Sequence, residues 1–134
     1  MTNLKEWIKK CEGYKPKPYL DTLGKLSIGY GRNLKDNGIS LEEANFMFEN
    51  DLARCQKELY PYSWYLHQPL HIQYALVNMC FNLGLTKLLG FKKMIQALEE
   101  KNYTKAAMEA LDSKWATQVK GRAKQVALMM REGF

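Results

Sequence analysis

The chain has 134 residues, of which 46% are hydrophobic and 25% are charged. These fractions exclude a disordered or collagen-like protein, and a chain of this size buries about two-thirds of its surface, so one folded domain over residues 1–134 is expected. The formal net charge of +6 predicts attraction to polyanions, which include nucleic acid, anionic lipid and the acidic bacterial cell wall.

The first forty residues predict one helix followed by a small β-structure. Asn3 with Glu6 three residues later is typical of a helix start, and Gly13 is typical of a helix end, so a helix is expected over about 4–12. Pro16 excludes a continued helix. The short apolar runs and turn residues that follow predict a β-hairpin or a three-stranded sheet.

From residue 41 the apolar residues recur with a helical period. Ser40 and Glu43 form a reciprocal capping pair, which predicts a long helix over about 41–59. Pro69 opens a helix that is apolar nearly all round, so we expect this helix at the centre of a bundle. Shorter helices are expected at about 91–100, 104–112 and 121–131, with breaks at Gly90 and Gly121.

Together these elements predict an α+β fold in which a small lobe precedes a larger all-helical lobe. We expect the β-containing lobe at about 13–40 and the long connecting helix at about 41–59. The helical lobe is expected at about 64–134, with residues 1–12 packed on it.

The sequence also favours a reducing compartment. Cys11, Cys55 and Cys80 cannot all pair, and no Cys-x-x-Cys spacing occurs, so reduced thiols are expected. The polar N-terminus lacks the features of a secretory signal, and no apolar run approaches the roughly 20 residues that span a bilayer. We therefore expect accumulation in the cytoplasm. A monomer is also expected.

No metal or cofactor is expected. His67 and His71 have the spacing of two zinc ligands on one helical turn, but Gln68 stands where the zinc motif has Glu, and Pro69 interrupts the turn. A complete dinucleotide motif and a phosphate-binding loop are also missing from the sequence.

Two carboxylates are candidates for acid–base chemistry. Glycoside hydrolysis needs one carboxyl group to protonate the leaving oxygen and a second group to manage water or the developing cation. Glu12 lies at a helix C-terminus, where the helix dipole disfavours an ionised carboxylate, and Asp21 lies on the next turn with the Ser27 hydroxyl nearby. On spacing alone, a solvated Glu and a turn-capping Asp remain the stronger alternative.

The order of the motifs adds to this reading. Glu12 is followed after eight residues by Asp21, after five more by Ser27, and then by Ile28-Gly29-Tyr30-Gly31. This segment resembles the catalytic hairpin of the phage-type lysozymes, or endolysins, of glycoside hydrolase family twenty-four. The resemblance continues in order through Arg32-Asn-Leu34, Asn78-Met-Cys-Phe-Asn-Leu-Gly84, Gly90-Phe91, Ser113-Lys-Trp115 and Arg122-Ala-Lys124.

The resemblance implies a lysozyme-like fold with a cleft between two lobes, and it implies roles for individual residues. Glu12 corresponds to the proton donor, and Asp21 corresponds to the second carboxylate, which stabilises the oxocarbenium-like centre and positions water. Ser27 stands where the family most often has Thr and keeps the hydroxyl that orients a water. Arg122 corresponds to an Arg that pairs with the catalytic Glu.

Two positions depart from the pattern of the family. Some members place an Asp before the catalytic Glu and a His after the second hairpin glycine, where the two form a supporting ion pair. Cys11 and Arg32 occupy these positions here. We therefore expect other contacts to stabilise the small lobe.

The implied cleft also suggests residues that bind substrate. Asn78 and Asn82 recur at helical spacing on an otherwise apolar helix, with Phe81 between them. As a cleft wall, their amides would bind the N-acetyl groups of sugars; alternatively, they bond a neighbouring helix. Asn33 is a further candidate for the same role.

The resemblance implies a muramidase that hydrolyses the β-1,4 bond between N-acetylmuramic acid and N-acetylglucosamine in peptidoglycan, with inversion and without a cofactor. It also implies release to the wall when a separate protein opens the membrane. A lytic transglycosylase would cut the same bond with one acidic residue, so Asp21 and Ser27 argue against it. A cationic membrane-active protein and a nucleic-acid binder are non-enzymatic alternatives. We expect no nucleic-acid partner, while the basic last helix leaves contact with an anionic membrane surface open.

Overall fold

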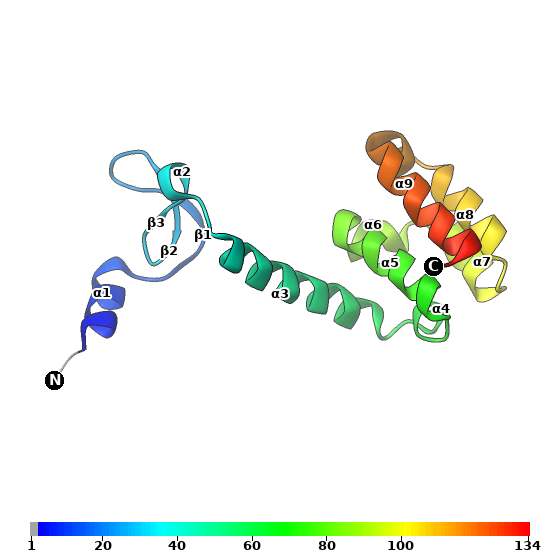
Figure 1. Cartoon of the computed structure of the whole chain (residues 1–134), viewed down its shortest axis with the longest axis horizontal. Coiled ribbons are helices and arrows are strands. Elements are labelled where there is room, and N and C mark those ends of the chain that lie inside the picture. Colours follow the sequence, from blue (N-terminus) through cyan, green and yellow to red (C-terminus); the bar gives the residue numbers. More distant parts are fainter. Residues whose placement is uncertain (1–2) are drawn as a thin grey trace. The chain divides into compact units, whose positions relative to one another are not determined.

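The computed structural model describes residues 3–134, which fold into two compact units. One unit extends to Phe46 and the other runs from Met47 to Phe134, so the division falls inside one long helix, α3, at Leu41–Leu59 (Figure 1). The first unit holds the sheet and the second is all-helical, which confirms the predicted α+β class. None of the described helices is both long and apolar enough to cross a membrane.

The first unit begins with α1, Leu4–Glu12, whose predicted limits are confirmed. Asn3 caps the helix by accepting a hydrogen bond from the Glu6 amide at 2.8 Å. Gly13 ends it with a φ of 73°, a backbone conformation that glycine adopts at little cost.

Three antiparallel strands in the order β1-β2-β3 follow α1, so the sheet has three strands rather than two. Pro16 and Pro18 lie on β1, an edge strand, where the missing N–H groups of proline are tolerated. A short helix, α2, was not predicted from the sequence. The elements are β1 at Lys15–Leu20, β2 at Leu26–Gly29, β3 at Arg32–Asn33 and α2 at Leu34–Asn37.

An ion pair joins the sheet to the start of α3. Arg32 on β3 donates through Nη1 to Glu43 Oε1 at 2.9 Å, and its Nη2 donates to the other carboxylate oxygen. Glu43 also forms the predicted reciprocal cap with Ser40, through contacts of 2.8 and 3.1 Å. This network supplies contacts other than the ion pair of the family, as the departure at Arg32 led us to expect for the small lobe.

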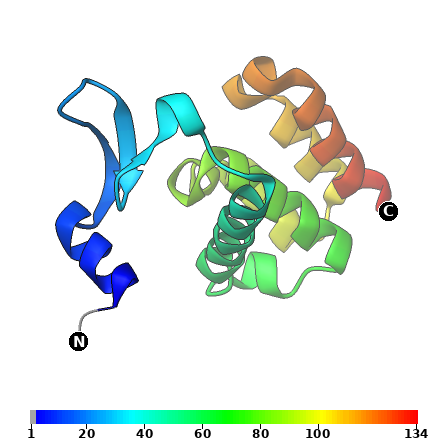
Figure 2. The same ribbon diagram turned by 60° about the vertical axis from the view of Figure 1, so that its left-hand side comes forward.

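The helical unit is built around α5, whose buried residues confirm the predicted central helix. Helices α8 and α9 pack against each other, and α9 also packs on α5 (Figure 2). The backbone of Lys120 is non-helical (φ 10°, ψ −78°) and kinks α9 next to Gly121, which agrees with the predicted break and with the predicted helix over about 121–131. The first part of α9, which starts at Lys114, was not predicted from the sequence. The helices after α3 are α4 at Ser63–Leu66, α5 at Leu70–Leu83, α6 at Leu85–Leu89, α7 at Lys92–Glu99, α8 at Tyr103–Leu111 and α9 at Lys114–Glu132.

The pH dependence of stability tests the ion pair. The hydrogen bond from Arg32, followed by that from the Ser40 amide, lowers the pKa of Glu43 from 4.5 to about 2. A carboxylate with a lowered pKa stabilises the fold fully above its unfolded-state value, and this contribution is lost as the pH falls from 4.5 toward 2. We expect Glu43→Gln to lower the melting temperature at pH 7. The difference in melting temperature between wild type and variant should become smaller as the pH falls from 4.5 toward 2.

Glu42→Gln is the matched control, because it removes a carboxylate from the same helical turn. In melts followed by circular dichroism, the melting temperature of this variant should fall with decreasing pH as that of the wild type does. Equal melting temperatures for the two variants at pH 7 would show that the ion pair does not stabilise the unit.

Candidate active site

Glu12 is the last residue of α1, and its carboxyl group lies against the turn between β2 and β3. The approach is so close that a Cβ atom on Gly31 would lie 2.6 Å from Glu12 Oε2. The side chain is otherwise exposed to solvent. The carboxyl group is therefore available to a ligand while one side of it is backed by the sheet.

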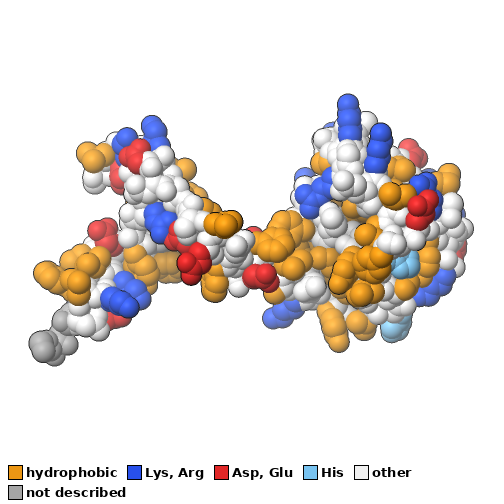
Figure 3. Space-filling view, viewed as in Figure 1, with side chains coloured by type: hydrophobic (Ala, Val, Ile, Leu, Met, Phe, Trp, Pro, Cys, Tyr) orange, Lys and Arg blue, Asp and Glu red, His pale blue; other side chains and the backbone are white. Residues whose placement is uncertain are grey.

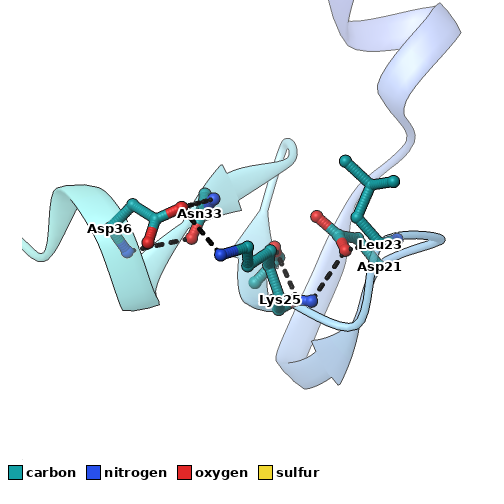
Figure 4. Close-up of polar contacts among 6 residues, drawn as sticks. Asp21, Leu23, Lys25, Asn33 and Asp36 are labelled. Atoms are coloured by element: carbon teal, nitrogen blue, oxygen red, sulfur yellow. Dashed lines mark hydrogen bonds and ion pairs between the residues drawn. The ribbon is translucent and has the colours of Figure 1, made fainter.

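Asp21 lies at the other end of the β1–β2 hairpin and organises its turn. Its Oδ1 accepts hydrogen bonds from the amides of Leu23, at 2.9 Å, and Lys25, at 2.8 Å (Figure 4). The turn-capping alternative is thus realised in the structure. It does not exclude chemistry, because both bonds use Oδ1 and no described residue hydrogen-bonds Oδ2.

Lys25 connects Asp21 to two other candidate residues. The Ser27 hydroxyl, on β2 and 2% exposed, donates to the carbonyl of Lys25 at 3.2 Å. The Lys25 ammonium lies 3.5 Å from Asp36 Oδ2, and the same oxygen accepts from Asn33 Nδ2 at 2.9 Å (Figure 4). The structure therefore brings Asp21, Ser27 and Asn33 into one polar network. No pattern in the sequence marks Lys25, because most of its contacts in this network are made by its backbone.

Strand β2 spaces the candidate groups. Asp21 precedes it across the turn, Ser27 lies within it, and Gly31, which contacts Glu12, follows its end. With a rise of about 3.3 Å per residue, the strand is about 10 Å long. Glu12 and Asp21 therefore lie toward opposite ends of this strand.

The other candidate residues lie in the helical unit. Asn78 Oδ1 accepts from Arg122 Nε at 2.7 Å, and Asn82 Oδ1 accepts from Trp115 Nε1 at 2.8 Å. Both amide oxygens therefore bond α9, as the structural alternative predicted. Phe81 packs on Phe48, with ring centroids 5.6 Å apart.

Three of these residues line one groove. Phe81, Asn78 and Arg122 border a hollow of about 520 Å³, whose remaining lining comes from α3, α4 and α5. Asn82 is not among the lining residues. In the part of the chain that the structure describes, no three His, Cys, Asp or Glu side chains gather to hold a metal ion.

The family model described as Phage lysozyme matches residues 9–132. The chain therefore belongs to the phage lysozyme family, and its class is that of a lysozyme-type glycoside hydrolase that degrades peptidoglycan. The match includes both the sheet that carries Asp21 and Ser27 and the helices that carry Asn78 and Arg122.

Three curated relatives cover nearly the whole chain at modest identity. The pre-baseplate central spike protein Gp5 of Enterobacteria phage T4 is 29% identical over 98% of this chain. The chain spans only 28% of the length of that protein. Probable T4-type lysozymes 2 and 1 of Dictyostelium discoideum are 27% and 28% identical over 99% of the chain and 96% of their own lengths.

The alignments are longer than the chain itself. They extend over 161 to 163 positions, compared with 134 residues here. The relatives therefore carry residues that have no counterpart in this chain.

The bond between Asn82 and Trp115 can be tested by its effect on stability. Asn82→Ala leaves the N–H of an indole that is only 4% exposed without its partner, which costs about 1–3 kcal/mol of unfolding free energy. Asn78→Ala is the control, because water can replace its bond to Arg122 on the surface, at a cost of about 0.5 kcal/mol or less. Equal losses in urea unfolding would contradict this assignment.

Proposed function

We propose that this protein is a muramidase of glycoside hydrolase family twenty-four, which hydrolyses the β-1,4 bond between N-acetylmuramic acid and N-acetylglucosamine. The observation that carries the proposal is the placement of Glu12 and Asp21 at opposite ends of one short hairpin, with Ser27 between them. A pair of carboxyl groups on either side of a sugar is the arrangement that glycosidases use.

In this mechanism the Glu12 carboxyl group donates its proton to the glycosidic oxygen as the bond from that oxygen to the anomeric carbon breaks. The Asp21 carboxylate stabilises the positive charge that develops on the sugar, and Oδ2 is its available oxygen. A water then attacks the anomeric carbon from the opposite face and loses its proton to Asp21. The product is inverted, as expected when a water fits between the two carboxyl groups.

Ser27 would orient the attacking water. Its hydroxyl hydrogen is donated to the carbonyl of Lys25, so its oxygen lone pairs remain to accept a hydrogen bond from the water. The backbone of Lys25 thus connects the group that positions the water with the carboxylate that receives its proton.

The proposal assigns further contacts to the helical unit. The amide nitrogens of Asn78 and Asn82 would donate to sugar N-acetyl groups, since their oxygens are already engaged by α9. Phe81 has a partly exposed ring that would contact the sugar chain. Asn33, on the sheet, is the remaining residue proposed to bind substrate. Arg122 would act as a supporting residue, as the resemblance to the family implies.

The net charge of +6 supports attraction to an anionic cell wall. On the face drawn in Figure 3, Lys and Arg side chains are scattered rather than gathered in one patch. The three free cysteines favour accumulation in the reducing bacterial cytoplasm before release to the wall. A monomer acts alone in this proposal.

Substitution of the two carboxyl groups tests the mechanism. Glu12→Gln removes the donated proton and should lower kcat on purified peptidoglycan by at least about 100-fold. Asp21→Asn should disable the enzyme as well, and Ser27→Ala should slow it severely. Glu6→Gln is the control, because it neutralises an exposed carboxylate on the same helix, away from the Gly31 turn. Full activity of either carboxylate variant would contradict the assignment, and lysis that survives Glu12→Gln would indicate membrane activity.

The mass of the product distinguishes hydrolysis from transglycosylation. A hydrolase adds water and leaves a free reducing end, whereas a transglycosylase forms a 1,6-anhydro sugar that is lighter by one water. We expect digested peptidoglycan to give only the hydrated muropeptides in mass spectrometry. Anhydro products would overturn the proposed reaction while leaving the cleaved bond unchanged.

A further inference from the structure

Gly31 differs from the other described glycines in what it faces. It lies in the turn between β2 and β3 with a φ of +77°. A Cβ atom built there would lie 2.6 Å from Oε2, 3.1 Å from Cδ and 3.7 Å from Cγ of Glu12. Gly24 and Gly29 have nearly the same φ, +76° and +71°, but nothing lies within 4 Å of the corresponding position.

These distances mean that the whole carboxyl end of Glu12 rests on Gly31. Nonbonded heavy atoms are most favourable at about 3.5–4.0 Å, so 2.6 Å is a clash that would force the carboxyl group away. An alanine at position 31 would therefore have two separate effects: it would strain the backbone and it would displace the flexible end of the Glu12 side chain. At Gly24 and Gly29 only the first effect applies.

The turn that contains Gly31 also packs against α1. The ammonium group of Lys9 lies 5.2 Å from the centre of the Tyr30 ring, a cation–π contact between the helix and the turn. Tyr14 packs on the same ring, with centroids 5.7 Å apart. Tyr30 thus holds the turn close to the end of α1, and the adjacent glycine leaves room for the carboxyl group there.

We infer that Gly31 is a positioning residue for Glu12. Because Gly31 has no side chain, the carboxyl group of Glu12 can lie directly against the turn, and the turn then limits where this carboxyl group lies. This inference rests on the proposed function, in which Glu12 is the proton donor. Gly31 has no reacting group of its own and acts through its contact with Glu12.

Gly31→Ala tests the inference, and Gly24→Ala is its matched control, because both variants place alanine at the same unfavourable φ. A displacement of about 1 Å can slow an enzyme by about 100-fold, so we expect kcat for Gly31→Ala about 10–100-fold below that for Gly24→Ala. KM on a soluble peptidoglycan fragment should stay within about twofold, and both variants should lose similar thermal stability.

A double-mutant cycle measures whether the effects of the two substitutions on kcat depend on each other, which a purely structural role of Gly31 would not produce. Glu12→Asp withdraws the carboxyl group from the turn, so adding Gly31→Ala to it should cost less than about threefold in kcat. If Gly31→Ala does not fold, Gly31→Asn and Gly24→Asn replace the pair, since Asn tolerates positive φ and carries the same Cβ.

The outcomes separate this inference from the function on which it rests. If Glu12→Gln is inactive while Gly31→Ala matches Gly24→Ala in kcat, the positioning role is wrong and the catalytic assignment stands. Equal, additive losses in the Glu12→Asp background would also overturn it. Full activity of Glu12→Gln would instead refute the proposed function itself.

Discussion

The short central strand β2 is the constraint on which the proposed chemistry depends. Its backbone pairs with β1 and β3 on either side, so it cannot shift without breaking both ladders. The turn at one end fixes Asp21 through two amide hydrogen bonds, and the turn at the other end backs the carboxyl group of Glu12. Each end of this strand thus lies next to one of the two carboxyl groups, and catalytic groups are placed more precisely on rigid elements than on loops.

A sheet of three short strands has little apolar surface to bury, and the Arg32–Glu43 ion pair compensates for this. The contact is partly exposed, and isolated exposed pairs contribute little to stability. This pair differs because the same carboxylate caps α3 and the same guanidinium bonds the carbonyl of Gly38. It therefore ties the sheet, the loop and the long helix together in one network.

The sequence predicted the elements that carry strong local signals. Helix α1 was bounded by Asn3 and Gly13, and α3 by its capping pair with Ser40, because caps depend on residues a few positions apart. Helices α2, α4 and α6 were missed because four or five residues show no periodicity. The early start of α9 was missed although Ser113 caps it through a bond of 3.1 Å to the amide of Ala116.

The candidate site was predictable only in part, for a physical reason. The spacing of the residues indicated Glu12 and Asp21. From the sequence, turn capping and catalysis were alternative roles for Asp21, but its geometry permits both at once. Asn82 could not be assigned a structural partner, because Trp115 is 33 residues away in the sequence. The close contact of Gly31 with Glu12 depends on the tertiary approach of a helix to a turn, which no local pattern encodes.

The central claim is that β2 holds an acid and a second carboxylate on either side of a sugar. A crystal structure of the Glu12→Gln protein with a bound peptidoglycan fragment measures this most directly. The account predicts the scissile glycosidic oxygen within hydrogen-bond distance of the residue 12 side chain, with the sugar ring between it and Asp21. A fragment bound with its scissile bond away from both side chains would contradict the account.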